Sequence, residues 1–354
     1  MPPDSVVIVG VGMMTAVGLS AAETAASVRA GTMRFGESSV HDKEDEPVTL
    51  AQVPADAIPP LTRAAATMSG LTGRERRMLR LATRPLLEAI APLAATGSMG
   101  GVPLCMALPE TETRLPLGRE RFVRALAAQV GGVFDAARTD ASHAGRAGGV
   151  AAIGQAAITI HSGAAFVIAG GIDTYFDPYV IATLDVEQRV KSHVNVDGFI
   201  PGEGGGFLLL ASEQAAAARG LTPLARLSPV ATGFEPGHLY SSEPYRGDGL
   251  AATLAQLVAY GAPTPFAEVY ASMNGESHWA KEWGVGHLRN SAAFGPNHGM
   301  HHPADRFGDT GAACGPLMTG LAALGIKGSY RRSPTVVYAS SDRGGRAAVA
   351  LAAP

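Results

Sequence analysis

Cysteine and histidine are the residue types in this chain best suited to nucleophilic or metal chemistry, and their spacing limits that chemistry. The two cysteines, Cys105 and Cys314, lie far apart and form no CxxC motif, so neither a disulfide framework nor a thiolate metal site is predicted. His298, His301 and His302 gather in one short segment. No helical i, i+4 pair with an acid accompanies them, as zinc motifs often require. We therefore expect them to pin a surface loop, with a metal site as the alternative.

Two glycine-rich segments could in principle bind nucleotide phosphates. Gly10-Val-Gly12 follows an apolar run, but it lacks the third glycine and the ribose-binding acid of a dinucleotide fold. The glycines at 202 and 204–206 are not followed by the Lys-Ser/Thr pair of a phosphate loop. The sequence therefore predicts no nucleotide site, and no other cofactor is predicted.

Composition favours a large α/β protein. The chain has 354 residues, of which 46% are hydrophobic and 17% charged, with 44 glycines and 24 prolines that suit many short elements joined by turns. Its net charge of −3 gives no indication of a positively charged surface that would bind nucleic acid or an anionic membrane. No apolar run approaches the roughly 20 residues of a membrane span, and no signal peptide is recognisable. A cytoplasmic location is predicted.

The elements that must position any site follow from apolar patterning. Continuous apolar runs predict strands buried on both faces, and a run of small apolar residues predicts a helix packed between sheets. The strands are expected at 5–11, 102–108, 165–169, 207–211, 225–232, 268–272, 335–339 and 347–352. The helices are expected at 20–29, 73–93, 119–130, 148–161, 213–219, 249–260 and 309–324, the last capped by Asp309, and an irregular excursion at 31–72.

These elements form two copies of one strand-helix plan, each with a buried glycine-alanine helix. Such a repeat predicts stacked layers in the order α-β-α-β-α. We expect two closely packed halves, residues 1–220 and 221–354, because no low-complexity linker separates independent domains.

Several strings resemble the β-ketoacyl synthases of the thiolase superfamily. Val6-Val-Ile-Val-Gly-Val-Gly12 is similar to their opening strand, and Ala152-Ile-Gly-Gln-Ala156 to their nucleophile helix. Asp197-Gly-Phe-Ile-Pro-Gly-Glu-Gly-Gly-Gly206 is nearly their DGFVPGEGAG loop. The resemblance spans most of the chain in the right order and implies the thiolase-like fold.

The same resemblance places the catalytic positions, where the expected Cys-His-His or Cys-His-Asn set is missing. Counting back along the nucleophile helix puts Arg146 in the cysteine position, and a guanidinium stays protonated and cannot attack a thioester. Asn274 and Asp309 stand in the two histidine positions. Asparagine cannot shuttle a proton, and an ionised carboxylate repels an oxyanion. No catalytic set is predicted at these degenerate positions.

Further polar residues are expected to converge at the position that the active-site pocket has in the condensing relatives: His143, Glu276, His278, Asp342 and Arg343. We expect a satisfied network that plugs a redundant cavity, because buried charges tend to be paired. A pairing of Arg146 with Asp309 is one way in which the cavity would be filled. The alternative is a rebuilt site for acyl transfer or hydrolysis with Glu276 as base.

The resemblance also suggests a role. Some segments are similar to thiolase-like proteins encoded beside type VI secretion cargo, which implies a non-condensing adaptor or scaffold with an effector as protein partner. A chain-length-controlling partner of an active, cysteine-bearing synthase is a further alternative. Because active relatives dimerise, a homodimer is also expected.

Overall fold

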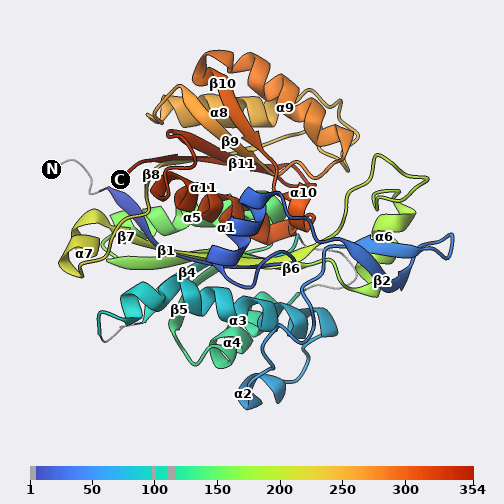
Figure 1. The fold of residues 1–354 in the computed structure, drawn as a ribbon, viewed down its shortest axis with the longest axis horizontal. Helices are drawn as coiled ribbons and strands as arrows, with labels where there is room; N and C mark the ends of the chain where they lie inside the picture. Colours follow the sequence, from blue (N-terminus) through green and yellow to red (C-terminus); the bar gives the residue numbers. More distant parts are fainter. Residues whose placement is uncertain (1–4, 98–100, 111–116) are drawn as a thin grey trace.

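Ten strands form one large mixed sheet in the computed structural model, which describes residues 5–97, 101–110 and 117–354. The first five of them are β1 (Val6–Thr15), β4 (Val102–Ala107), β5 (Phe134–Ser142), β6 (Phe166–Thr174) and β7 (Glu203–Ser212). The other five are β8 (Ala225–Phe234), β9 (Phe266–Ala271), β10 (Phe294–His301), β11 (Thr335–Ser340) and β12 (Gly345–Ala352). The two sets occupy different layers of the molecule (Figure 1).

The strand order is the same in the two sets. The first runs β5-β4-β6-β7-β1 and the second β10-β9-β11-β12-β8. In each set two parallel pairings are followed by two antiparallel ones. A short antiparallel ladder between β1 and β8 joins the sets, with Val6 opposite Leu227. The proposed boundary between residues 220 and 221 falls between the last helix of the first half and β8, and it stays a prediction.

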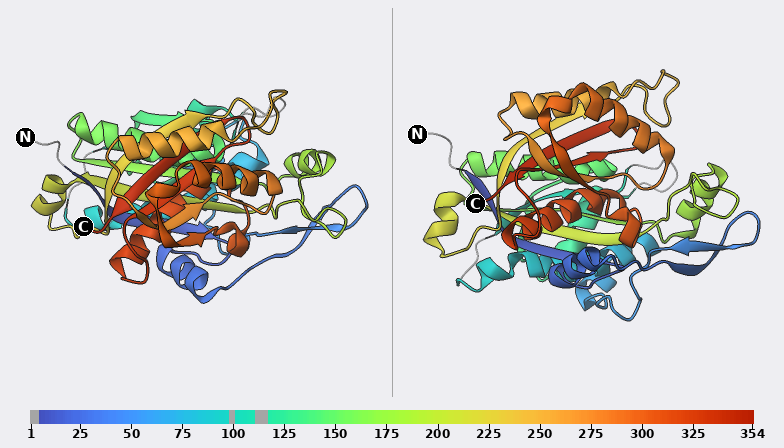
Figure 2. Two further views of the ribbon diagram at one scale, coloured as in Figure 1. Left: turned by 90° about the horizontal axis from the view of Figure 1, so that it is seen from above. Right: turned by 45° about the horizontal axis from the view of Figure 1, so that its top comes forward.

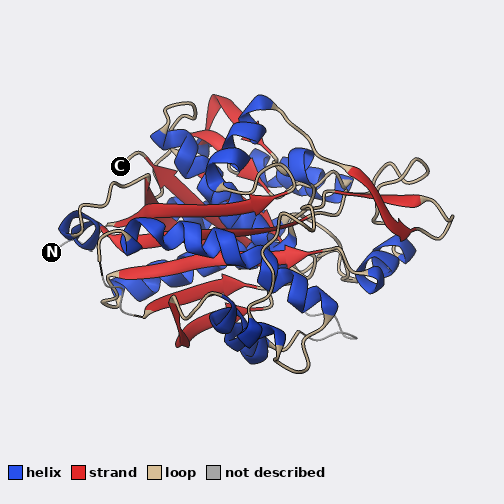
Figure 3. Cartoon of the chain, turned by 60° about the horizontal axis from the view of Figure 1, so that its bottom comes forward, coloured by secondary structure: helices blue, strands red, loops and turns tan. Residues whose placement is uncertain are grey.

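Helices cover both outer faces and fill the space between the two sets of strands (Figures 1 and 3). The outer layers are α3 (Gly73–Ala94) and α4 (Arg119–Gln129) on one side, and α8 (Asp248–Ala259) and α9 (Ser277–Arg289) on the other. The middle layer is built on α5 (Gly145–His161) and α11 (Cys314–Lys327). The α-β-α-β-α thiolase-like architecture expected from the sequence is therefore confirmed. The shorter helices are α1 (Ala21–Ala30), α2 (Arg63–Ala66), α6 (Pro178–Val186), α7 (Glu213–Ala218) and α10 (Ala304–Phe307), with 3-10 turns at Ser291–Ala293 and Gly311–Ala313.

The hydrophobic core follows these layers. One buried cluster joins α5 and α11 to both sets of strands, a second lies under α3 and α4, and a third lies under α8 and α9. β7 is buried along all but its last residue, as expected of a strand covered by helices on both faces. The continuous apolar runs in the sequence therefore reflect burial on two sides.

Close contact between α5 and α11 depends on glycine. A Cβ on Gly149 would lie 2.5 Å from Pro316 Cδ and 2.7 Å from the Ala312 carbonyl oxygen. A Cβ on Gly315 would lie 2.7 Å from the Val150 nitrogen. The small residues therefore let the two backbones touch, and this contact brings the first turns of both inner helices together.

Some elements were not predicted from the sequence. The segment 31–72, expected to be irregular, contains α2 and a hairpin of β2 (Gly36–His41) and β3 (Pro47–Leu50) that projects from one side (Figure 2). β2 is polar and largely exposed, so no apolar run marks it. The polar strands β5 and β10, with α6 and α9, were also missed, because tertiary packing rather than local patterning determines them.

No helix among the described parts of the chain is both long and apolar enough to cross a bilayer.

Replacing Gly149 by alanine should lower the free energy of unfolding by about 1–3 kcal/mol, because the added methyl overlaps α11. The matched control is Gly284→Ala in α9, where nothing lies within 4 Å of the added Cβ. That change should leave stability equal or raise it by about 0.5–1 kcal/mol, since alanine favours the helix. Urea unfolding measures both variants. Equal stability of the two would contradict the packing argument.

Candidate functional site

The first turn of α5 places a buried arginine at the centre of the molecule. Gly145 begins the helix with φ +58°, a conformation that favours glycine. The following residue, Arg146, is only 3% exposed. Its Nε donates to the Ser340 carbonyl oxygen at 2.8 Å, and its Nη1 to Asp309 Oδ2 at 2.5 Å. Its Nη2 donates to Asp342 Oδ1. The guanidinium therefore has a partner on every nitrogen.

A second arginine, in the segment after α6, extends the same network. Arg189 forms a two-point ion pair with Glu276, with its Nε 2.8 Å from Oε1 and its Nη2 2.9 Å from Oε2. Its Nη1 donates to Asp342 Oδ2 at 2.7 Å. Asp342 thus bridges the two guanidiniums. We refer to Arg146, Arg189, Glu276, Asp309 and Asp342 as the ion-pair cluster.

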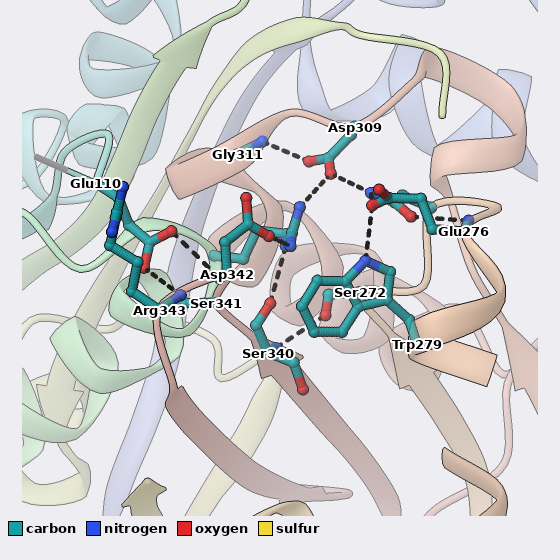
Figure 4. Close-up of polar contacts among 12 residues, drawn as sticks. Glu110, Ser272, Glu276, Trp279, Asp309, Gly311, Ser340, Ser341, Asp342 and Arg343 are labelled. Atoms are coloured by element: carbon teal, nitrogen blue, oxygen red, sulfur yellow. Dashed lines mark hydrogen bonds and ion pairs between the residues drawn. The ribbon is translucent and has the colours of Figure 1, made fainter. Parts of the chain in front are cut away.

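Neutral side chains complete the hydrogen bonding of the cluster (Figure 4). Asn274 Nδ2 donates to Asp309 Oδ2 at 2.8 Å and to Glu276 Oε2 at 3.0 Å. Trp279 Nε1 donates to Glu276 Oε2 at 2.9 Å, and its ring lies 4.7 Å from the guanidinium carbon of Arg146. Arg146 pairs with Asp309, and each charge within the cluster has a partner of opposite sign.

The neighbouring charges favour the ionised forms of Arg146 and Asp342. Burial opposes the charge on Arg146, but Asp342 and Asp309 outweigh it and hold the pKa well above its usual value. Burial also raises the pKa of Asp342, yet Arg146 and Arg189 together lower that pKa to about 2. Arg146 and Asp342 are therefore both ionised at neutral pH. A protonated guanidinium has no lone pair with which to attack a thioester.

Neither cysteine lies at the first turn of α5. Cys105 is in the middle of β4, where burial and Asp140 raise the pKa of its thiol to about 11. Cys314 is the first residue of α11, where burial and Asp309 raise the pKa of its thiol well above the usual range. Both thiols are protonated at neutral pH, and only the thiolate is a good nucleophile.

The predicted site residues separate into two groups. Arg146, Asn274, Glu276, Asp309 and Asp342 meet at the ion-pair cluster, whereas three others lie outside it.

His143 contacts the Pro109 carbonyl oxygen through Nδ1 at 3.0 Å. The ring of His278 lies 4.5 Å from that of Tyr245, and the guanidinium of Arg343 lies 4.7 Å from the ring of Tyr240. These three residues therefore surround the cluster rather than forming part of it.

Asp309 does not cap a helix, contrary to the sequence-based expectation. α11 begins five residues later, at Cys314, after a 3-10 turn, and it runs to Lys327 rather than to residue 324. The carboxylate of Asp309 instead accepts a hydrogen bond from the Gly311 nitrogen at 2.8 Å and from Arg146. The ion pair with Arg146 draws the side chain toward α5.

Sequence reasoning missed Arg189 and the second ion pair beside the cluster. Arg346 Nε donates to Glu282 Oε1 at 2.6 Å, and both side chains are almost fully buried. The Ser340 hydroxyl donates to the same carboxylate. No local pattern marks an arginine that pairs with a residue far along the chain. The only usable signal was the density of charged residues around 276–282 and 342–346.

The three clustered histidines make separate contacts. His301 Nε2 lies 2.8 Å from Glu268 Oε2, and His302 Nδ1 lies 2.6 Å from Asp305 Oδ2. His298 Nδ1 contacts the Gly295 carbonyl oxygen at 2.8 Å. Within the described residues, no group of three or more His, Cys, Asp or Glu side chains is arranged to hold a metal ion.

A pocket of about 100 Å³ lies beside the cluster, lined by Arg146, Arg189 and Asp342 among other residues. Half of its lining residues are charged, which differs from the mainly apolar cavity that an acyl chain would require.

Comparison with known proteins defines the fold class. No family model matches the chain. A segment of 103 residues is 33% identical to "Actinorhodin polyketide putative beta-ketoacyl synthase 2" of Streptomyces coelicolor, and the match covers 26% of this chain and 25% of that protein. The chain thus spans about a quarter of the curated relative that it matches.

Solved structures match over nearly the whole chain. The ishigamide ketosynthase/chain length factor has a TM-score of 0.79 and 15% identity, covering 99% of this chain and 100% of that one. The ketosynthase ApeO in complex with its chain length factor ApeC, from Xenorhabdus doucetiae, also has a TM-score of 0.79 and 15% identity, covering 99% and 98%. The protein therefore has the thiolase-like fold of the ketosynthases and chain length factors. The identity to these structures is too low to establish more than the fold.

Replacing Arg146 by methionine should lower the free energy of unfolding by about 3–5 kcal/mol, because Asp309 and Asp342 would lose their shared buried cation. The matched control is Arg289→Met, which breaks the ion pair of Arg289 with Asp248 whose side chains are 49% and 52% exposed. That pair should contribute less than about 1 kcal/mol. Chemical denaturation measures both variants, and equal losses would show that the cluster is not the main stabilising feature.

Proposed function

We propose that the protein is a non-condensing relative of the ketosynthases that acts as a protein-binding subunit. The observation that supports this most directly is the guanidinium of Arg146 at the first turn of α5, closed off by Asp309 and Asp342. Decarboxylative condensation needs a nucleophile to hold the acyl chain and hydrogen-bond donors for the enolate and the oxyanion. Here the central group is a cation, and the groups facing it are hydrogen-bond acceptors.

A rebuilt acyl-transfer or hydrolytic site is a weaker proposal. Glu276, its expected base, accepts hydrogen bonds from Arg189, Asn274 and Trp279. A carboxylate whose lone pairs are used in this way is poorly placed to take a proton from water or substrate. The ion-pair cluster favours a structural role for Glu276.

The partner that we propose is a cysteine-bearing ketosynthase. Two similar structures are the ishigamide ketosynthase/chain length factor and the ketosynthase ApeO in complex with its chain length factor ApeC. On this chain, a groove of about 610 Å³ lies between α5 and β8, lined mainly by small and apolar residues that include Leu227 and Val230. Ile158, on the same face of α5, is 58% exposed. An exposed apolar groove on an inner helix suits a protein partner.

An adaptor role for type VI secretion effectors stays a prediction from the resemblance alone. It shares the non-condensing, protein-binding character of the proposal but requires a different partner. A homodimer through the same groove is the other arrangement that would cover Ile158.

The purified protein should not extend acyl thioesters, because no thiolate is positioned to hold the acyl chain. It should not release CO₂ from malonyl thioesters either, because Asn274 and Trp279, the neutral donors at the cluster, already bond to carboxylates and are not free to stabilise an enolate. Radiolabelled CO₂ release and product chromatography measure both steps, with an active cysteine-bearing synthase as the positive control. Turnover that disappears in Glu276→Ala or Asp309→Ala would instead support the rebuilt acyl-thioester enzyme.

The variant Ile158→Glu should reduce co-purification with a co-expressed cysteine-bearing ketosynthase from the same genome at least tenfold, because it places a charge in the groove. The control is Leu288→Glu on α9, where the parent side chain is 75% exposed but lies outside the groove. It should bind as well as the parent protein. Equal binding by both variants would show that the groove is not the surface that binds the ketosynthase. A concentration-dependent dimer of this chain that Ile158→Glu dissolves would point to the homodimer instead.

A further inference from the structure

The pocket beside the ion-pair cluster has a lining that differs from the cluster itself. It lies where α6 and the segment that follows it approach the ends of β4 and β11, and Glu110, Tyr175, Glu187, Tyr240 and Asp342 contribute to its wall. Its volume is about 100 Å³, enough for a small polar group together with water. Arg146, Arg189 and Asp342 of the ion-pair cluster form part of its lining.

Two carboxylates at this pocket have no cationic partner among the described residues. Glu110 accepts only the backbone nitrogens of Asp342 and Arg343, at 3.2 and 3.3 Å. Glu187 accepts the Tyr240 hydroxyl at 2.6 Å. The other carboxylates around the pocket already share the guanidiniums of Arg146 and Arg189 or, for Asp173, pair with Arg74. Arg343 is the cation of the lining that forms no ion pair with a described residue, so the two carboxylates leave a negative balance of about one charge among the unpaired groups of the pocket.

The pocket also presents an aromatic face to a cation. The Tyr240 ring lies at its wall, and the guanidinium carbon of Arg343 lies 4.7 Å from the ring centroid. That side chain is exposed and forms no ion pair with a described residue. The hydroxyl of Tyr175, another wall residue, has no hydrogen-bond partner in the described chain. An aromatic ring that already contacts a guanidinium, next to carboxylates without an ion pair, is a typical binding environment for an organic cation.

We propose that this pocket binds a guanidinium group of a ligand or of a protein partner's arginine, with Glu110 as its carboxylate acceptor, Tyr240 as its stacking surface and the Tyr175 hydroxyl as a further polar contact. The inference goes beyond the proposed function, since it concerns a ligand of the pocket and holds whether or not the partner is a ketosynthase.

Binding should strengthen as pH rises through neutrality. Burial and the nearby charge of Asp342 raise the pKa of Glu110 to about 7, while Arg146 lowers it. The other charged groups around the pocket are Arg74, Asp173, Glu187, Arg189 and Arg343. A bound cation favours the ionised carboxylate, so binding releases a proton from Glu110 near pH 7. With that pKa, the ionised fraction rises about tenfold between pH 6 and 8.

The test is a titration of the full chain with ethylguanidinium, with ethylurea as the neutral probe of the same shape and ethylammonium as the compact cation. Calorimetry at low ionic strength, at pH 6 and pH 8, measures affinity and proton release. We expect ethylguanidinium to bind at least fivefold more tightly at pH 8 than at pH 6, ethylammonium to bind more weakly than ethylguanidinium, and ethylurea not to bind.

Single substitutions test which side chains contact the bound guanidinium. Glu110→Gln, which keeps the shape of the side chain and an acceptor oxygen for one of the two backbone nitrogens, should weaken ethylguanidinium binding at pH 8 at least fivefold and remove the proton release. Arg343→Gln should strengthen binding by removing the competing guanidinium of the chain. Glu120→Gln, at an exposed position on α4, is the matched control and should change nothing.

Equal binding of ethylurea and ethylguanidinium, or no binding of ethylguanidinium at 100-fold excess over the expected millimolar range, would overturn the proposal. Unchanged affinity in a folded Glu110→Gln variant would also overturn it. Because these readouts involve no thioester and no protein partner, their failure is distinct from failure of the proposed function.

Discussion

Burial of a charged side chain requires partners of opposite charge, because an unpaired ion loses most of its hydration energy in the interior. The guanidinium of Arg146 is almost completely buried between two sets of strands, and it is bonded to Asp309 and Asp342. Arg189 and Glu276 join the same network through Asp342. The loops that bear these residues are therefore held together at one point, although they come from both halves of the chain.

The network depends in turn on the small residues of the middle layer. Gly149 and Gly315 allow α5 and α11 to touch, which brings Arg146 near Asp309. A similar close contact of inner helices would be compatible with catalysis in a protein with a cysteine at the same turn. What distinguishes this chain is the set of side chains that surround the turn.

The layered architecture was predictable because it depends on apolar runs. β7 is buried along all but its last residue and α5 along its first six residues, and continuous apolar or small-residue segments mark both. The closeness of Arg146 and Asp309 was also predictable, since the resemblance placed both residues at the same catalytic centre. Arg189, β5 and α9 were not, because their sequences show no local signal. Arg189 contacts a glutamate 87 positions away, and only the folded chain reveals such a pair. The same limit explains the misplaced start of α11, where an ion pair outweighed the usual preference of aspartate for a helix cap.

The geometry of the two inner helices also affects the charge balance at the cluster. Three carboxylates face two guanidiniums there. Both α5 and α11 begin beside the cluster, and the first turn of a helix exposes backbone N–H groups with partial positive charge. The amide of Gly311, which donates to Asp309 just before α11, adds to this. Part of the compensating positive potential therefore comes from the main chain, and it would persist after substitution of any single side chain in the cluster.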